Sequence, residues 1–273
     1  MMNRREFAGL AGAATAAIPA RAVAQTTGLG QPHAPLVPED DPSIVVERTQ
    51  LRRPDGAVAA YAAYPKAIRA NTPGIVVVMH IWGVDAQIRD TVRRFAKAGF
   101  SCIAPDLYSR MNPPSGDGVT DIEVFKPLAG QLQRKQYDGD LRSGGLHLLS
   151  KAPQCKLGVT GFCMGGHLAL IQALDNSDVF DAVAPFYGAV KDIDPTQLHI
   201  PVCGSYGEKD GSIPAEDVRT WRGLLRVPND VRIYPSAAHA FFDDTRGAYV
   251  ASAADDAWKR TYAFFKETLG LQT

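Results

Sequence analysis

The sequence lacks an excess of charge of either sign, a motif with metal-ligand spacing, and an apolar run long enough to span a bilayer. Its 273 residues include 29 Lys and Arg and 29 Asp and Glu, so neither a basic nucleic-acid-binding face nor an acidic disordered chain is indicated. No Cys-x-x-Cys or His-x-x-x-His pair occurs, which leaves no spacing that predicts a metal site. With 45% apolar residues, the chain can bury a large core. We expect a globular protein with a small-molecule partner, no cofactor, no nucleic acid and no membrane span.

Cysteine is scarce, with four residues at positions 102, 155, 163 and 203. An even number requires that disulfides be considered, but the four lie far apart in a chain much larger than disulfide-stapled scaffolds. Cys102 and Cys203 lie inside apolar, strand-like runs. Buried reduced thiols are the favoured interpretation for both.

The first 24 residues combine paired Arg4 and Arg5, a short Ala/Gly-rich apolar run, and the small residues Ala22-Val23-Ala24 before Gln25. This order is typical of an export signal, and a disordered tail would not require it. The segment resembles twin-arginine signals, with Asn3 where a Ser or Thr is usual. We therefore expect residues 1–24 to direct export to a bacterial periplasm.

The rest of the chain predicts one domain. Residues 25–43 are rich in Pro, Gly and charge and indicate a linker or a strap over the domain, which spans residues 44–273. Strands are predicted at 58–64, 74–80, 101–107, 156–162, 181–187, 201–207 and 230–236, and helices at 85–99, 164–174, 215–225 and 252–270. This alternation favours an α/β fold with a mostly parallel sheet flanked by helices. Residues 110–140 are the least regular, as in a loop over an active site.

The segment GFCMGG, residues 161–166, places Cys163 between glycines where a predicted strand meets a predicted helix. Such a G-x-nucleophile-x-G turn is a nucleophile elbow, in which the glycines allow close packing and the nucleophile projects above the sheet. The start of the helix favours a thiolate and offers N–H groups to an oxyanion. The alternative is a thiol that only packs in the core.

A cysteine nucleophile requires a base and an orienting acid, in the chain order nucleophile, acid, histidine. Asp210 follows one predicted strand and His239 follows the last one, so both lie where α/β folds place their sites. His33 lies in the linker, His147 and His167 lie on helical patterns, and His199 precedes a predicted strand, so these four fit the base less well. Asp217 lies on a predicted helix, and Asp243 and Asp244 follow the base, so Asp210 is the preferred acid.

Four segments together resemble the dienelactone hydrolase family (carboxymethylenebutenolidases), which are α/β-hydrolases with a cysteine nucleophile. They are VVVMHIWGVDAQIRDTVRRFAKAGFSCIAPDLYSR, GFCMGG, GEKDGSIP and AHAFFDDTRGAYVASAADDAWKRTYAFF, and the resemblance extends over most of residues 44–270. It implies a triad of Cys163, Asp210 and His239, and an oxyanion hole made by the backbone N–H groups of Ile81 and Met164. The implied reaction is cleavage of an ester or lactone through an acyl-thioester, without a cofactor.

Two positions depart from the family pattern. His80 stands where the family has a glutamate in a QEIFG-like segment, and an imidazole could instead polarise the thiol. Members that act on dienelactone have an arginine four residues after the base, where this chain has Asp243. Arg246 could replace it, or could form a surface ion pair with an adjacent aspartate.

We predict that His80, Trp82 and Arg246 contact substrate, and that Tyr108 and Phe242 could also line the pocket. The departures make a broad-specificity carboxylesterase an alternative. A catalytically silent ligand-binding protein of the same fold and a thiol redox module are alternatives from other classes, and the sequence predicts no oligomeric state.

Overall fold

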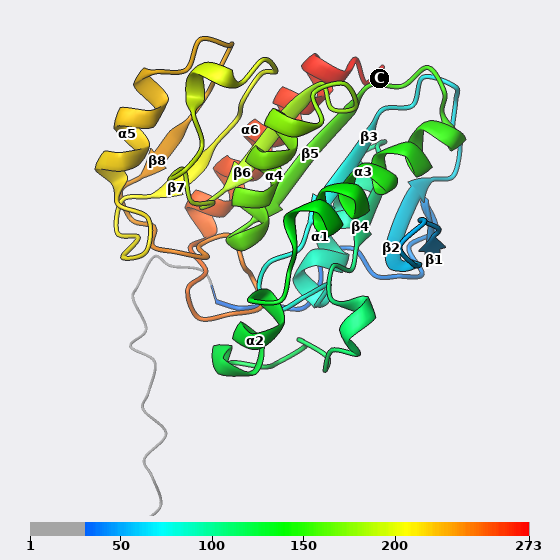
Figure 1. Cartoon of the computed structure of the whole chain (residues 1–273), viewed down its shortest axis with the longest axis horizontal. Coiled ribbons are helices and arrows are strands. Elements are labelled where there is room, and N and C mark those ends of the chain that lie inside the picture. The colour runs from blue at the N-terminus through cyan, green and yellow to red at the C-terminus, as the bar shows by residue number, and fades with distance from the viewer. Residues whose placement is uncertain (1–30, 273) are drawn as a thin grey trace, which may run out of the picture.

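The computed structural model describes residues 31–272, which form one domain around an eight-stranded sheet (Figure 1). The strand order is β1-β2-β4-β3-β5-β6-β7-β8, in which β2 runs antiparallel to both of its neighbours, β1 and β4, and all other neighbouring strands are parallel. The strands are β1 (Ile44–Leu51), β2 (Val58–Pro65), β3 (Gly74–Val78), β4 (Ser101–Pro105), β5 (Leu157–Phe162), β6 (Ala182–Phe186), β7 (Ser205–Gly207) and β8 (Arg232–Tyr234). The predicted α/β fold is confirmed, as are all seven predicted strands.

The central strands are buried along their whole length. Every residue of β3, β4, β5 and β6 is inaccessible to solvent or nearly so, which explains their continuous Val, Ile and Ala runs. Strand β1 was not predicted from the sequence. It is an edge strand with mostly half-exposed or exposed residues, so its sequence carries little of the buried-strand signal.

Helices cover both faces of the sheet (Figure 1). They are α1 (Ala86–Lys97), α2 (Lys126–Ala129), α3 (Arg134–Lys151), α4 (Met164–Asp175), α5 (Ala215–Gly223) and α6 (Ala251–Leu269). α1 and α6 share one face, where Phe95 packs against Trp258 and Phe265. α3 and α4 lie together on the other face with α5. The four predicted helices are confirmed.

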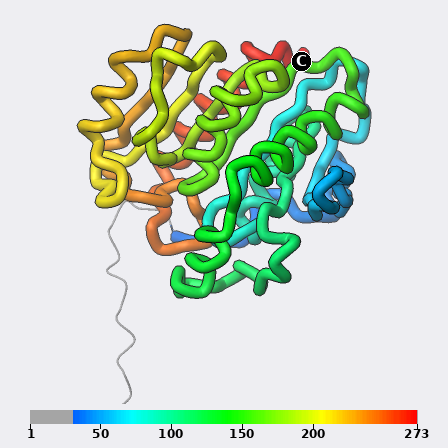
Figure 2. Tube along the Cα trace, in the orientation of Figure 1, coloured from blue at the N-terminus to red at the C-terminus, as the bar shows by residue number. Residues whose placement is uncertain are grey.

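The prediction of an irregular segment at 110–140 is correct only in part. Residues up to 133 hold two short 3₁₀ turns, Ser109–Met111 and Ile122–Val124, and the single turn α2, and they project from one edge of the sheet (Figure 2). The last seven residues already belong to α3, a helix that was not predicted. Its interior contains Gly139, Gly144 and Gly145, which disfavour a helix when only the sequence is considered.

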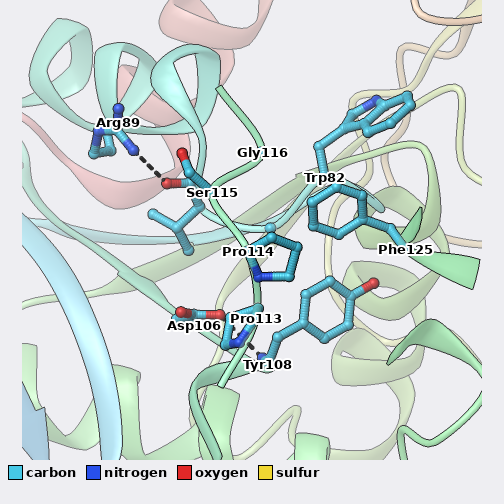
Figure 3. Close-up of a pocket in the computed structure, with 11 residues that line it drawn as sticks. Trp82, Arg89, Asp106, Tyr108, Pro113, Pro114, Ser115, Gly116 and Phe125 are labelled. Atoms are coloured by element: carbon cyan, nitrogen blue, oxygen red, sulfur yellow. Dashed lines mark hydrogen bonds between the residues drawn. The ribbon is translucent and has the colours of Figure 1, made fainter. Parts of the chain in front are cut away.

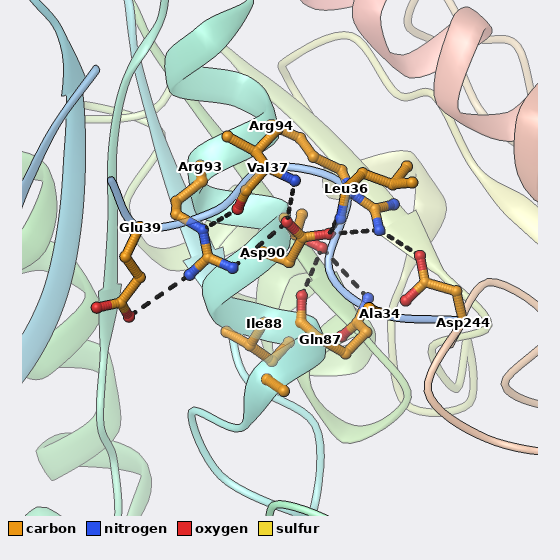
Figure 4. Close-up of polar contacts among 12 residues, drawn as sticks. Ala34, Leu36, Val37, Glu39, Gln87, Ile88, Asp90, Arg93, Arg94 and Asp244 are labelled. Carbon is orange, nitrogen blue, oxygen red and sulfur yellow. Dashed lines mark hydrogen bonds and ion pairs between the residues drawn. The ribbon is translucent and has the colours of Figure 1, made fainter. Parts of the chain in front are cut away.

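Residues 31–43, the described part of the predicted linker or strap, lie along α1 (Figure 4). The backbone N–H groups of Leu36 and Val37 donate to the carboxylate of Asp90 at 3.0 and 2.9 Å, and Arg93 donates back to the carbonyl of Val37. Asp90 is 1% exposed. The segment is therefore attached to the domain by buried polar contacts.

The predicted export signal, residues 1–24, lies outside the described residues. Among residues 31–272, none of the helices combines the length and apolar character needed to cross a bilayer.

Candidate active site

Cys163 occupies a strained turn between β5 and α4. Its φ of 55° and ψ of −119° are rare for any residue other than glycine, and its N–H donates to the carbonyl of Phe186 at 3.1 Å. The flanking glycines are required by packing. A Cβ on Gly161 would lie 2.1 Å from the carbonyl oxygen of Gly165, and one on Gly165 would lie 2.4 Å from the carbonyl oxygen of Met79. The strand and helix therefore approach closely, and the cysteine stands at the point of the turn.

Asp210 and His239 meet beyond the ends of β7 and β8. The Nδ1 of His239 lies 2.7 Å from the Oδ2 of Asp210, and the other oxygen of Asp210 accepts the N–H groups of Ser212 and Ile213. Burial, which raises the pKa of Asp210, is outweighed by the hydrogen bond and charge of His239 and by these N–H groups, so that the pKa is lowered. The carboxylate stays ionised and holds the ring in one orientation.

The same imidazole interacts with the cysteine. Burial lowers the pKa of His239, but hydrogen bonds with Asp210 and Cys163 outweigh it and raise the pKa to about 10. The ring is therefore protonated at neutral pH, and an imidazolium beside sulfur stabilises a thiolate. The structure brings together all three residues of the predicted triad.

The predicted oxyanion donors, the backbone N–H groups of Ile81 and Met164, belong to residues that line one cavity with Cys163. Within residues 31–272, neither N–H group donates a turn, cap or side-chain hydrogen bond. Met164 is the first residue of α4, so its N–H adds to the positive end of the helix dipole. Both groups are thus available to an oxyanion.

The cavity beside Cys163 has a volume of about 510 Å³. All three predicted substrate contacts, His80, Trp82 and Arg246, lie on its wall. The full wall consists of His80, Ile81, Trp82, Ile122, Cys163, Met164, His167, Tyr187, Ala189, Ser212, Ile213, His239, Ala240, Asp243, Arg246 and Ala248. Ile122 comes from the irregular segment, which therefore reaches over the site.

Arg246 and His80 belong to a buried cluster of charged side chains. The Nε and Nη2 of Arg246 lie 3.1 Å from carboxylate oxygens of Asp243 and Asp85, respectively. The Nε2 of His80 lies 2.9 Å from Asp85, outside hydrogen-bond geometry, and its Nδ1 lies 3.8 Å from Asp243. Asp85 and Asp243 are 2% and 0% exposed. The ion pair of Arg246 with Asp243 is thus present, and it is buried rather than at the surface.

Trp82 lines both the main cavity and a second cavity of about 210 Å³, whose lining residues are drawn in Figure 3. Its ring lies edge to face with Phe125 at 5.7 Å and carries the guanidinium of Arg246 at 4.1 Å from its centre. Tyr108 lines only the second cavity. The expectation that Phe242 lines the pocket is wrong, because its ring is buried against Phe162 and Phe186.

Sequence reasoning missed two residues of the site. Tyr187 is fully buried at the end of β6, has a φ of 36°, and lies edge to face against His239 with ring centres 5.2 Å apart. Its place at the end of a predicted strand was the available signal. Asp85 is the N-cap of α1 and accepts the N–H of Ile88. Its second oxygen binds Arg246.

Among residues 31–272, no three His, Cys, Asp or Glu side chains are grouped so as to hold a metal ion. The chemistry available on the cavity wall is that of a cysteine beside an imidazolium, N–H donors and a buried set of ion pairs.

The chain is similar to known proteins over most of its length. The profile of the dienelactone hydrolase family matches residues 58–269. A protein of Escherichia coli (strain K12) named "Putative carboxymethylenebutenolidase" is 34% identical over 269 residues, which cover 90% of this chain and 97% of that protein. A protein of Yersinia pestis with the same name is 36% identical over 229 residues, or 76% of this chain and 83% of the relative.

A solved structure is similar as well. The crystal structure of a "Putative Dienelactone Hydrolase" from Klebsiella pneumoniae is 32% identical and superposes with a TM-score of 0.75, covering 82% of this chain and 99% of that one.

Proposed function

Since the chain belongs to the dienelactone hydrolase family and is therefore a hydrolase, we propose that it cleaves a carboxylic ester or lactone through an acyl-thioester on Cys163. The observation that carries the proposal is the placement of His239 between Asp210 and Cys163, at the wall of a cavity of about 510 Å³. A nucleophile, a base and an orienting acid at one cavity are the components of acyl transfer.

In the first half of the reaction, the Cys163 thiolate attacks the carbonyl carbon and a C–S bond forms. Negative charge develops on the carbonyl oxygen, where the N–H groups of Ile81 and Met164 stabilise it. The C–O bond then breaks, and the leaving alkoxide takes the proton of the His239 imidazolium. The products of this half are the free alcohol, or the opened lactone, and an acyl-thioester.

In the second half, neutral His239 takes a proton from water, and the resulting hydroxide attacks the thioester carbonyl. The C–S bond breaks, the acid leaves, and the thiolate and imidazolium are restored. Asp210 keeps Nδ1 of His239 protonated throughout, so that Nε2 is the atom that exchanges protons.

The test is hydrolysis of dienelactone and p-nitrophenyl acetate by the full chain and by its Cys163→Ala variant. We expect the variant to lose at least ~10³-fold in kcat/KM on each substrate that the wild type cleaves. Cys155→Ala is the matched control and should retain activity, because Cys155 lies outside the cavity wall. Equal rates for wild type and Cys163→Ala would overturn the proposal and favour a silent ligand-binding protein.

We also propose that the enzyme acts in the periplasm after export. The support is the order of paired arginines, apolar run and small residues in positions 1–24. N-terminal sequencing of protein from the periplasmic fraction should begin at Gln25, and replacement of Arg4 and Arg5 by lysine should retain the protein in the cytoplasm. Periplasmic protein that retains residues 1–24 would contradict cleavage at this site.

A further inference from the structure

The cavity beside Cys163 offers no uncommitted permanent cation. Arg246 is the one Arg or Lys on the wall within the described residues. Its guanidinium lies 3.1 Å from each of Asp85 and Asp243, donates to the carbonyl oxygens of Gly116 and Val119, and lies over the ring of Trp82. Only 14% of this side chain is exposed. A substrate carboxylate would have to displace one of these partners to bind it.

The charges near Arg246 do not favour an anion. Asp85 and Asp243 carry two negative charges against one positive charge on Arg246, and His80 lies between the two carboxylates. The four groups sum to −1 with a neutral His80 and to zero with a protonated one. Because the cluster is buried, a substrate carboxylate beside Asp243 would be repelled with little screening.

The two remaining histidines on the wall are each held through Nδ1 by a protein group. His239 is bound by Asp210 and interacts with Cys163. The Nδ1 of His167 donates to the carbonyl of Ala189 at 2.8 Å, so this ring is also held by a protein partner.

The rest of the wall is apolar. The apolar residues come from the oxyanion turn, the irregular segment and the loops after the strands, and they are Ile81, Trp82, Ile122, Met164, Ala189, Ile213, Ala240 and Ala248. An apolar wall with few polar groups recognises neutral, apolar ligand atoms.

We propose, on the basis of the proposed hydrolysis, that the substrate is an ester or lactone whose acyl part is uncharged and apolar, and that the site rejects acyl groups bearing a carboxylate. Asp243 and Asp85 are the specificity-determining residues, because they neutralise Arg246 and place negative charge at the cavity wall.

The test compares p-nitrophenyl methyl succinate with p-nitrophenyl hydrogen succinate, which differ only in whether the far carboxyl group is esterified. At equal pH and ionic strength, the wild type should show a kcat/KM about 10-fold or more higher for the neutral ester. An equal or higher value for the carboxylate-bearing ester would overturn the inference.

A binding measurement separates this inference from the proposed hydrolysis. Butyranilide and succinanilic acid are amides that differ in one terminal carboxylate, and their dissociation constants can be measured by calorimetry without turnover. Tighter binding of butyranilide supports the inference even if neither ester is cleaved. Failure to cleave either ester would overturn only the proposed hydrolysis. Tighter binding of succinanilic acid would overturn the inference even if both esters are cleaved.

Asp243→Asn tests the assigned residue. Removing one carboxylate raises the summed charge of the cluster from −1 to zero with a neutral His80, and from zero to +1 with a protonated one, so the preference for the neutral ester should fall by about 10-fold. Asp244→Asn is the matched control, because Asp244 is equally buried but pairs with Arg94 and lies outside the cavity wall. If Asp243→Asn does not fold, the comparison of the two succinate esters with the wild-type protein still tests the inference. An unchanged preference in a folded Asp243→Asn protein would contradict the assignment.

Discussion

The four cysteines of the chain lie in very different surroundings. Burial raises the pKa of Cys102 well above the ordinary value, and it raises those of Cys155 and Cys203 to about 11. Cys163 instead stands at the start of α4 next to a protonated His239. Of the four cysteines, only Cys163 thus has surroundings that favour a thiolate.

This difference predicts selective alkylation. At pH 7, iodoacetamide should modify Cys163 at least ~100-fold faster than the half-buried Cys155, because a thiol with a pKa of about 11 is almost entirely protonated. Peptide mapping by mass spectrometry measures both rates. The Cys163→Ser variant should lose the fast reaction, and fast labelling of Cys155 or Cys203 would contradict this account.

The raised pKa of His239 predicts a pH dependence of stability. The folded value, about 10, exceeds the ordinary 6.5, so protonation favours the folded state. This contribution is complete below pH 6.5 and is lost as pH rises through 10. The free energy of unfolding of His239→Gln should therefore fall below that of the wild type by a larger margin at pH 6 than at pH 10.

Urea denaturation at pH 6, 8 and 10 measures this margin. His147→Gln is the control, because burial lowers the pKa of His147. The difference in free energy of unfolding between this variant and the wild type should not change between pH 8 and pH 10. A margin for His239→Gln that is constant with pH would show that the ring is not protonated preferentially in the folded state.

The sequence predicted the positions of Cys163, Asp210 and His239 because each belongs to a local motif after a strand, and the structure shows His239 in contact with the other two. It could not predict that Arg246 also binds Asp85, or that its ion pair with Asp243 is buried. The contact with Asp85 spans 161 residues and depends on which loops meet at the sheet edge.

At the scale of secondary-structure elements, the turn from β5 to α4 depends on close backbone approach. The carbonyl oxygens of Val78 and Met79 would each lie 2.4 Å from a Cβ on Gly165. Backbone atoms of β3 cannot move away without disturbing the centre of the sheet. The glycine is thus required by the position of β3 and by the adjacent turn.

We expect Gly165→Ala to destabilise the protein by about 3 kcal/mol, with loss of activity in any folded fraction because Cys163 would be displaced. Gly223→Ala is the control. Its added Cβ meets nothing within 4 Å at the end of α5, so stability should change by at most about 1 kcal/mol. Thermal unfolding and esterase assays measure both effects. A fully active, equally stable Gly165→Ala protein would refute this description of the turn.

Glycine also explains why α3 could not be predicted. A Cβ on Gly144 would lie 3.0 Å from Pro105, and one on Gly145 would lie 2.9 Å from Val179. These glycines let α3 pack closely against its neighbours, and the tertiary contacts outweigh the low helix propensity. The strongly periodic α1 and the buried strands β3 to β6 were predictable because their local pattern agrees with their surroundings.

At the scale of the whole molecule, Asp90 connects the N-terminal strap to the domain. Besides the N–H groups of Leu36 and Val37, its carboxylate contacts Arg93 and Arg94 (Figure 4). The proline-rich composition of residues 25–43 could indicate a strap, but its path depends on partners more than 50 residues away.

Asp90→Asn should destabilise the protein by about 3 kcal/mol, because two arginines lose a buried negative partner. Asp178→Asn is the control, since Asp178 pairs with Arg142 while 63% exposed, and it should change stability by less than about 1 kcal/mol. Urea denaturation of both variants measures the difference. Equal small effects would mean that the strap contributes little to the stability of the domain.

The most direct test of the central claim is to detect the acyl-enzyme. The full chain is mixed with p-nitrophenyl acetate, quenched in acid during turnover and analysed by mass spectrometry. We predict the added mass of one acetyl group on the peptide that contains Cys163, and its absence from the Cys163→Ala variant. Continuing turnover with the acetyl group on another residue, or on none, would contradict the assignment of Cys163 as the nucleophile.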